Sequence, residues 1–148
     1  MKKIAKTQTP ENRPRVGIGI MIFKKGKVLL GKRKGSYASG EYCFPGGHLE
    51  YMESFKACAL REIAEESGIK VKNLKFCYLS NMKDYAPRHY VLIGFVADWK
   101  SGTPKILEPD KYDSWDWYDT DKLPTPTFVG SSEILEGYKK KIFYRDAK

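Results

Sequence analysis

One amphipathic segment in the middle of the chain limits the folds that are open to it. From Ser54 to Ser67 the apolar residues Phe55, Cys58, Ala59 and Ile63 fall at i, i+3, i+4 and i+8, which is the spacing of one helix face. Gly68 follows at the position of a C-terminal cap. Strand-like patterns stand before and after this segment, so the chain is predicted to pack helices on a sheet in an α/β or α+β arrangement.

The strand patterns alternate apolar residues with glycine, polar or aromatic ones. Ile18, Ile20 and Ile22 show the period of two most clearly. The expected strands are Val16–Phe23, Val28–Arg33 after a polar turn, Leu74–Leu79, His89–Trp99 and Trp115–Tyr118, and a last helix is expected over Ser131–Phe143. Periodicity alone therefore predicts a domain of mixed α and β structure.

The length of 148 residues fits one compact domain. Residues 1–15 are polar, include Pro10 and Pro14, and are expected to form a flexible leader before a single domain over residues 16–148. The three cysteines form no C-x-x-C pair, which indicates reduced thiols and no zinc or redox site. No signal peptide or membrane span is recognised, so a cytoplasmic location is expected.

Charge is distributed unevenly along the chain. The net charge of +9 is compatible with nucleic acid, an anionic membrane face or small polyanions such as nucleotides as partners. Within residues 47–69, however, five acidic residues face two basic ones, a local net charge of −3. This acidic segment coincides with the predicted helix.

Three glutamates of the predicted helix, Glu62, Glu65 and Glu66, occupy positions i, i+3 and i+4. Their carboxylates share one face, with Cβ atoms about 5–6 Å apart, and repel one another unless a cation lies among them. Oxygen ligands alone suit hard divalent ions such as Mg²⁺ or Mn²⁺. A solvated acidic face balanced by Arg61 is the competing interpretation, and the helix by itself leaves both open.

The residues upstream of the helix extend this pattern. Phe44-Pro45-Gly46-Gly47 supplies a glycine pair whose backbone can approach phosphates or lend a carbonyl to a metal. The combined stretch Gly47-x5-Glu53-x7-Arg61-Glu62-Ile63-x-Glu65-Glu66-x-Gly68-Ile69 matches every fixed position of the signature of the Nudix hydrolases, the family that the chain resembles. Segments around Arg33, His48, His89, Glu108 and Trp115 are similar, in order, to the MutT-like nucleoside triphosphate diphosphatases of that family. The resemblance implies the Nudix fold, a mixed β-sheet sandwiched between α-helices.

The resemblance also implies a metal site. Glu62 and Glu66 match the family's principal metal-binding glutamates, Glu65 matches a further ligand or the general base, and Gly46 matches the backbone carbonyl ligand. Mg²⁺, with Mn²⁺ as a substitute, would neutralise phosphate oxygens and activate a water for in-line attack on phosphorus. Which glutamate is the general base stays open.

Substrate contacts are expected from residues outside the acidic face. Arg33 resembles the family's phosphate-contacting arginine, and its planar fork suits bidentate phosphate binding. Gly47 and His48 match positions near the substrate, while Tyr90 and Phe128 are candidates for stacking on a base.

Two further residues of the signature are given a supporting role. Glu53 and Arg61 are expected to pair with each other and to brace the loop onto the helix.

The chain departs from the resembling proteins at two positions. They place a Phe-Trp pair at the base pocket after a Leu-Pro step, whereas this chain has Phe128-Val129. Met52 stands where many of them have glycine, although this position is not fixed in the signature. The first departure bears on base stacking and the second leaves the metal ligands intact.

These observations favour a Mg²⁺-dependent pyrophosphohydrolase that converts a nucleoside triphosphate, canonical, deoxy or oxidised, into the monophosphate and pyrophosphate. Two alternatives stay open: hydrolysis of another diphosphate (a nucleotide sugar, dinucleoside polyphosphate or prenyl diphosphate), and a non-catalytic module that binds a nucleotide or RNA. The expected partner is a small nucleotide, with no membrane and no nucleic acid, and homodimers are common among the resembling proteins. The preferred base, the physiological metal and the oligomeric state do not follow from the sequence.

Overall fold

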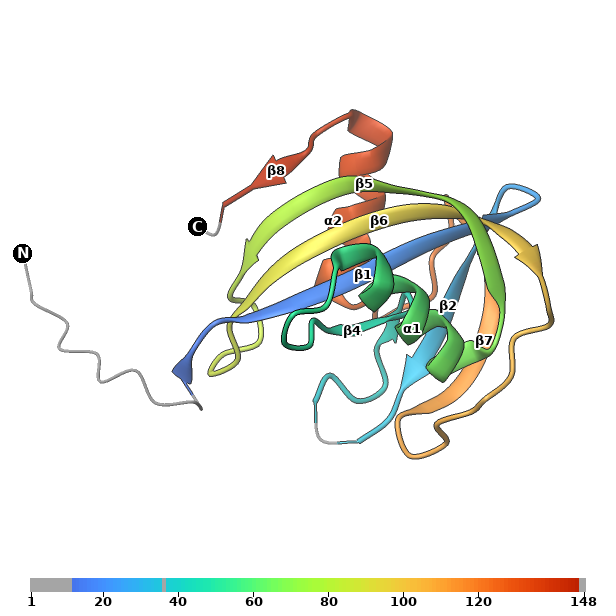
Figure 1. Ribbon diagram of the computed structural model, residues 1–148, viewed down its shortest axis with the longest axis horizontal. Helices are drawn as coiled ribbons and strands as arrows, with labels where there is room; N and C mark the ends of the chain where they lie inside the picture. The colour runs from blue at the N-terminus through green and yellow to red at the C-terminus, as the bar shows by residue number, and fades with distance from the viewer. Residues whose placement is uncertain (1–11, 36, 147–148) are drawn as a thin grey trace, which may run out of the picture.

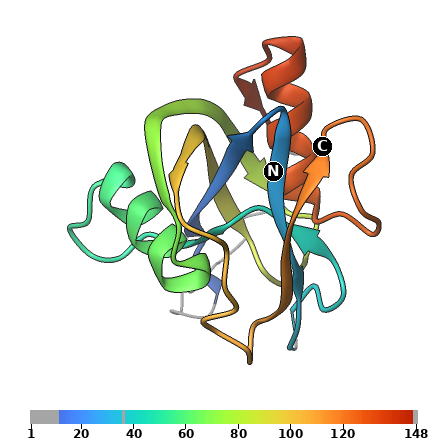
Figure 2. The same ribbon diagram turned by 90° about the vertical axis from the view of Figure 1, so that its right-hand side faces the viewer.

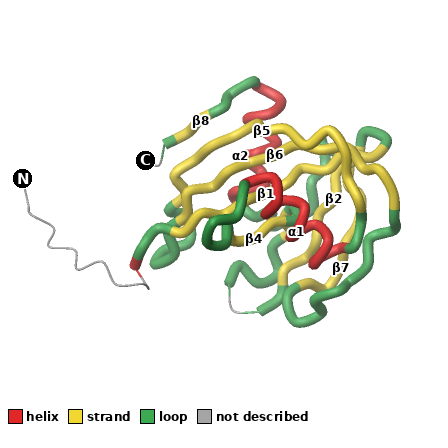
Figure 3. Tube along the Cα trace, in the orientation of Figure 1, coloured by secondary structure: helices red, strands yellow, loops and turns green. Residues whose placement is uncertain are grey.

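The computed structural model describes residues 12–35 and 37–146, so residues 1–11 of the leader predicted over residues 1–15 lie outside them, whereas Arg15 already belongs to the first strand. Strands form one mixed sheet with a helix on each side (Figures 1 and 3). In chain order the elements are β1 (Arg15–Lys24), β2 (Lys27–Arg33), β3 (Tyr42–Cys43), β4 (Gly46–His48), α1 (Phe55–Ser67), β5 (Lys70–Met82), β6 (Tyr90–Ser101), β7 (Tyr112–Asp119), α2 (Val129–Lys140) and β8 (Tyr144–Arg145).

Strand β1 is the centre of the sheet. It pairs in parallel with β6 along nearly its whole length and antiparallel with the short β4. Strand β2 pairs with β1 only beside the hairpin turn, where Phe23 lies opposite Val28. It then diverges to pair with β3 and β7. Because β1 and β2 diverge, β4 enters beside β1 and brings Gly46 and Gly47 into the interior.

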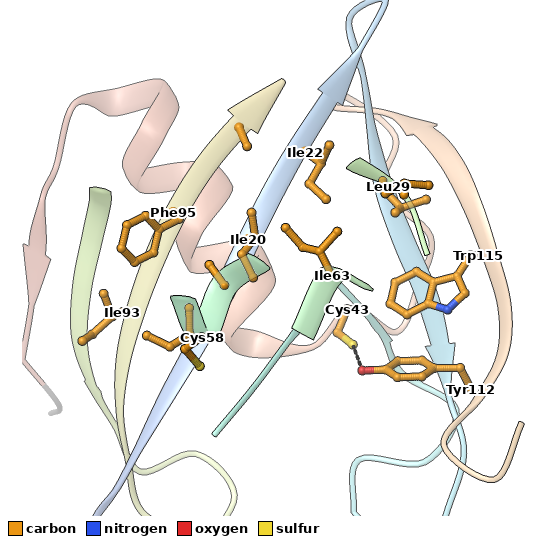
Figure 4. Packing of buried hydrophobic residues seen from close by; sticks show 14 residues of the cluster. Ile20, Ile22, Leu29, Cys43, Cys58, Ile63, Ile93, Phe95, Tyr112 and Trp115 are labelled. Atoms are coloured by element: carbon orange, nitrogen blue, oxygen red, sulfur yellow. Dashed lines mark hydrogen bonds between the residues drawn. The ribbon is translucent and has the colours of Figure 1, made fainter. Parts of the chain in front are cut away.

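The two faces of β1 pack against different helices. Ile18, Ile20 and Ile22 belong to the core cluster that contains Ile63 of α1 (Figure 4). Met21 belongs to the cluster that contains Ile134 of α2. Figure 2 shows α1 and α2 on opposite sides of the sheet, which confirms the predicted sandwich of a mixed sheet between helices.

Helix α1 follows the sequence prediction closely. The Ser54 Oγ accepts a hydrogen bond from the Ala57 N–H at 3.1 Å, and Gly68 ends the helix in the left-handed region at φ 73°. Cys58, Ala59 and Ile63 are buried, but Phe55, expected on the same face, is 48% exposed. Phe55 lies in the first turn, before the helix comes to lie over the core.

The remaining boundaries differ from the sequence patterns in instructive ways. β5 and β6 extend beyond the predicted ranges because they pair with each other from Lys70–Ser101 to Met82–Tyr90. The last helix covers Val129–Lys140 in place of Ser131–Phe143, since Lys141 takes a left-handed φ of 56° and turns the chain into β8. In the part of the chain that the structure covers, no helix is long and apolar enough to cross a membrane.

Candidate active site

A cleft of about 760 Å³ opens between β1, β4, β6 and α1. Every residue predicted to bind metal or substrate lies on its wall: Arg33, Gly46, Gly47, His48, Glu62, Glu65, Glu66, Tyr90 and Phe128. Arg61 also lines the cleft, whereas Glu53 lies behind Arg61. The fold therefore brings together residues that are up to 95 positions apart in the chain.

Glu66 is the buried member of the acidic trio. Its side chain is 3% exposed, and its Oε1 accepts a hydrogen bond from the Gly46 N–H at 2.7 Å. The Tyr112 hydroxyl lies beside the carboxylate and acts on its pKa as a second hydrogen-bonding neighbour. Burial raises the pKa of Glu66 to about 8, although these two neighbours oppose the shift.

Glu62 lies over the glycine pair of β4. A Cβ at Gly47 would collide with the Glu62 carboxylate, and one at Gly46 would collide with the Ile18 carbonyl oxygen. Both glycines are required by close approach, since each leaves the space that a neighbour fills. Burial raises the pKa of Glu62, while the hydrogen bond and charge of Arg61 oppose this.

The guanidinium of Arg61 contacts several groups of the acidic segment at once. It donates two hydrogen bonds to Glu53, at 2.7 and 2.9 Å, and one to the His48 carbonyl at 3.0 Å. Its Nη1 also reaches Glu62 at 2.7 Å and Glu65 at 3.3 Å. The predicted pairing of Arg61 with Glu53 is present in the structure, and Arg61 additionally neutralises part of the trio.

The donor set fits a hard divalent cation. Glu62, Glu65 and Glu66 offer carboxylate oxygens from one helix face toward the cleft, with the backbone of Gly46 beside them. Among the residues that the structure describes, no three acidic, histidine or cysteine side chains already converge as a metal site. Arg61 contacts Glu62 and Glu65, and the Gly46 N–H contacts Glu66, so a cation bound here would compete with Arg61 for Glu62 and Glu65.

Arg33 and aromatic rings form another part of the cleft. The Arg33 guanidinium lies over the rings of Tyr37 and Phe128, at 4.8 and 5.2 Å from their centroids. Phe128 stacks on Tyr85 with 4.9 Å between centroids and 14° between planes. A guanidinium and several aromatic rings thus lie side by side in this part of the cleft.

His48 of β4 and Tyr90 of β6 contact each other over β1, which lies between these two strands. The His48 Nε2 lies 3.1 Å from the Tyr90 hydroxyl. Burial lowers the pKa of His48, and the positive charges of Arg15 and Arg88 add to the effect. The imidazole is therefore neutral at pH 7 and acts as a hydrogen-bonding group in the cleft.

Several residues of this region are absent from the sequence-based site, and four of them are aromatic or basic groups near Arg33 or Phe128. Tyr37, Arg88 and Tyr112 line the cleft, and Tyr85 supports Phe128 from behind. Tyr37 belongs to a loop of small residues that carried no chemical signal, and Arg88 follows a cis Ala86–Pro87 turn. Only the fold places them near Arg33.

The comparisons with known proteins agree with this geometry. The model of the NUDIX domain matches residues 13–138. An ADP-ribose pyrophosphatase of Methanocaldococcus jannaschii is 34% identical over 130 residues, which cover 86% of this chain and 74% of that protein. The NAD-capped RNA hydrolase NudC of Chromobacterium violaceum is 31% identical over 112 residues, 75% of this chain; the chain spans about two fifths, 41%, of that relative.

A solved structure of a NUDIX hydrolase shares the fold of this chain. A MutT NUDIX hydrolase from Burkholderia pseudomallei superposes with a TM-score of 0.79 at 34% identity, covering 84% of this chain and 97% of that one. Sequence signature, mixed sheet and cleft all agree with the family predicted from the sequence. The chain belongs to the NUDIX domain family.

Proposed function

We propose that the protein is a nucleoside triphosphate diphosphatase. Water attacks one phosphorus of the α–β anhydride, the bond from that phosphorus to the bridging oxygen breaks, and the nucleoside monophosphate and pyrophosphate leave. One observation carries the proposal: a single cleft holds three carboxylates on α1 together with Arg33 and a group of aromatic rings. Carboxylates can hold a cation on the phosphates, while the rings and the guanidinium can hold the nucleoside and its charge.

The carboxylates divide the work according to their surroundings. Glu62, Glu65 and Glu66, with the Gly46 carbonyl, would hold the cation, which when bound neutralises phosphate charge and makes the attacking water more acidic. Glu66 is fixed by the Gly46 N–H and is suited to hold position. Glu65 is half-exposed and reaches Arg61 only at 3.3 Å, so it is the freest of the three to take a proton.

Residues away from α1 bind the rest of the nucleotide. Arg33 offers a guanidinium to phosphate oxygens, with no acidic ion pair to compete for it among the described residues. Phe128, which stacks on Tyr85 and lies under the Arg33 guanidinium, is the aromatic candidate for contact with the base. His48 and Tyr90 supply neutral hydrogen-bonding groups at the same wall.

A second candidate substrate is ADP-ribose or a related nucleotide sugar. It is favoured by the relative named ADP-ribose pyrophosphatase, which is 34% identical and of which the chain covers 74%. The carboxylates contact only the diphosphate in either case, so the candidates differ in what the remaining cleft accepts. The triphosphate is favoured by the similarity of the sequence to MutT-like enzymes, and the structural relative at the same identity is a MutT NUDIX hydrolase.

In the deciding experiment, the protein is incubated with Mg²⁺ in H₂¹⁸O and with one candidate substrate at a time. The candidates are nucleoside triphosphates, oxidised triphosphates, ADP-ribose, nucleotide sugars, dinucleoside polyphosphates and a prenyl diphosphate. Monophosphate plus pyrophosphate is expected from a triphosphate, and the product that carries ¹⁸O identifies the phosphorus that water attacks. Preference for ADP-ribose would replace the triphosphate assignment. Absence of hydrolysis together with salt-dependent RNA binding would favour a non-catalytic module. The Glu66→Gln variant is the matched control for contaminating phosphatases.

A further inference from the structure

A chain of buried polar contacts runs beneath the cleft and links Arg33 to Glu66. Arg33 Nη1 donates to the Cys43 Sγ at 3.8 Å, and the Cys43 thiol donates to the Tyr112 hydroxyl at 3.8 Å. The Tyr112 hydroxyl in turn lies beside the buried Glu66 carboxylate, on whose pKa it acts as a hydrogen-bonding neighbour, and both side chains line the cleft. Figure 4 shows the Cys43 sulfur and the Tyr112 hydroxyl directed at each other. No step of the proposed reaction uses Cys43 or Tyr112.

The direction of these bonds is fixed at both ends. A guanidinium only donates hydrogen bonds, and an ionised carboxylate only accepts them. The hydrogens of Cys43 and Tyr112 are therefore aligned toward Glu66 whenever that carboxylate is ionised. Cys43, Tyr112 and Glu66 are 3%, 5% and 3% exposed, so water does not compete for these contacts. Loss of one partner leaves a buried polar group without a hydrogen bond, which is costly.

A strand irregularity places Arg33 and Tyr112 opposite each other. In the pairing of β2 with β7, Lys32 lies opposite Ser114 but Arg33 lies opposite Tyr112, so Asp113 is an extra residue in β7. Such a bulge redirects the side chains beside it. Arg33 and Tyr112 are thereby paired across the strands and both line the cleft, while Asp113 is exposed.

We propose that Tyr112 is a positioning residue: its hydroxyl fixes the Glu66 carboxylate for the divalent cation and couples that carboxylate, through Cys43, to Arg33. This inference rests on the proposed function, because it assigns Glu66 to the cation and Arg33 to the phosphates. Partners that orient a metal ligand typically change metal affinity or activity by about 10–100-fold when they are removed. Tyr112 acts through Glu66 and does not itself contact the reacting atoms.

The test compares Tyr112→Phe with Tyr118→Phe and the parent protein. Phenylalanine keeps the ring beside Trp115, whose centroid is 4.5 Å away, and removes only the hydroxyl. Tyr118 lies on the same strand but does not line the cleft. Free Mn²⁺ is titrated by electron paramagnetic resonance without substrate, and the dissociation constant is expected to rise about 10–100-fold in Tyr112→Phe and to stay unchanged in Tyr118→Phe.

Kinetics give a second readout. Saturating Mg²⁺ is expected to restore most of kcat in Tyr112→Phe, with the substrate KM little changed. If Tyr112→Phe binds Mn²⁺ within twofold of the parent, the positioning role is wrong while the proposed function stands. If the parent protein neither binds Mn²⁺ nor hydrolyses a diphosphate, the proposed function fails and this inference fails with it.

A second pair of variants covers the case in which Tyr112→Phe does not fold. Cys43→Ala removes the thiol that donates to Tyr112 and leaves the tyrosine in place. Cys43→Ser keeps a donor of similar size. Weaker Mn²⁺ binding in Cys43→Ala, recovered in Cys43→Ser, is expected; equal binding in both and in the parent would overturn the proposal.

Discussion

Arg61 donates two parallel hydrogen bonds to Glu53, Nε to Oε2 at 2.7 Å and Nη2 to Oε1 at 2.9 Å. These hydrogen bonds hold the pKa of Glu53 at about 2. The same guanidinium reaches the His48 carbonyl and Glu62. One side chain thus ties the end of β4, the following loop and the acidic face of α1 into one unit.

Arg61→Lys is expected to lower kcat about 10-fold or more. An ammonium group cannot donate the two parallel bonds to Glu53 and still reach Glu62, so the loop and the carboxylates lose their common anchor. Steady-state kinetics at saturating Mg²⁺ measure the effect. Lys56→Ala, on the exposed side of the same helix, is the control. Parent-like kcat in Arg61→Lys would show that charge alone suffices.

Glu66→Gln is expected to lower turnover by at least 100-fold while the protein stays folded. The amide keeps an oxygen for the Gly46 N–H but provides no charge for a cation. Circular dichroism reports the fold, and product formation with Mg²⁺ reports the reaction. Turnover within 10-fold of the parent would remove Glu66 from the proposed site.

The metal-free protein is expected to lose stability as pH rises, because burial raises the pKa of Glu66 from 4.5 to about 8. The folded state then binds this proton more tightly than the unfolded state does. The stabilisation is complete below pH 4.5 and is lost as pH rises through about 8, at up to about 1.4 kcal/mol for each pH unit in this window. A divalent cation should offset the loss, since it stabilises the ionised carboxylate.

Urea unfolding of the parent and of Glu66→Gln in EDTA, from pH 5 to pH 8.5, isolates this contribution. Other titrating groups, such as His48, are common to both proteins and cancel in the difference. Parallel curves for the two proteins would mean that Glu66 titrates with its ordinary pKa.

The residues that sequence could place are those whose partners lie close in the chain. Glu62, Glu65 and Glu66 share a face by helical spacing, and Arg61 and Glu53 are eight positions apart at one helix end. Gly68 likewise marks the C-terminal end of α1 through its capping chemistry, whereas Ser54, expected inside the helix, is its N-cap.

The residues that sequence could not place depend on the sheet. Tyr112 meets Glu66 only because β7 pairs with β2 and carries an extra residue at Asp113. Such a bulge leaves no periodic signal. Phe55 shows the opposite error, since helical spacing put it on the buried face although the core lies only under later turns of α1. Local pattern predicts faces, and tertiary packing decides how far each face is covered.

Gly47→Ala is expected to reduce kcat strongly, by about 10–100-fold, with a smaller effect on the unfolding temperature. The new methyl group would occupy the space of the Glu62 carboxylate, which must rotate toward solvent. Mn²⁺ binding should weaken in parallel because Glu62 is displaced. Parent-like Mn²⁺ binding would show that Glu62 adopts its functional position elsewhere.

Phe128→Ala is expected to raise the KM for a nucleoside triphosphate about 10-fold and to leave kcat within about twofold. Stacking of a base on an aromatic ring contributes about 1–3 kcal/mol, and 1.4 kcal/mol corresponds to a factor of ten. Phe128 contacts Arg33 and Tyr85 and is separate from the carboxylates of α1, so Mn²⁺ binding should not change. Phe143→Ala, at a ring that is 64% exposed and does not line the cleft, is the matched control.

Comparing KM for the triphosphate with KM for inorganic tripolyphosphate separates base stacking from phosphate binding. A KM that rises equally for both would assign Phe128 to support of Arg33, and an unchanged KM would place the base elsewhere in the cleft.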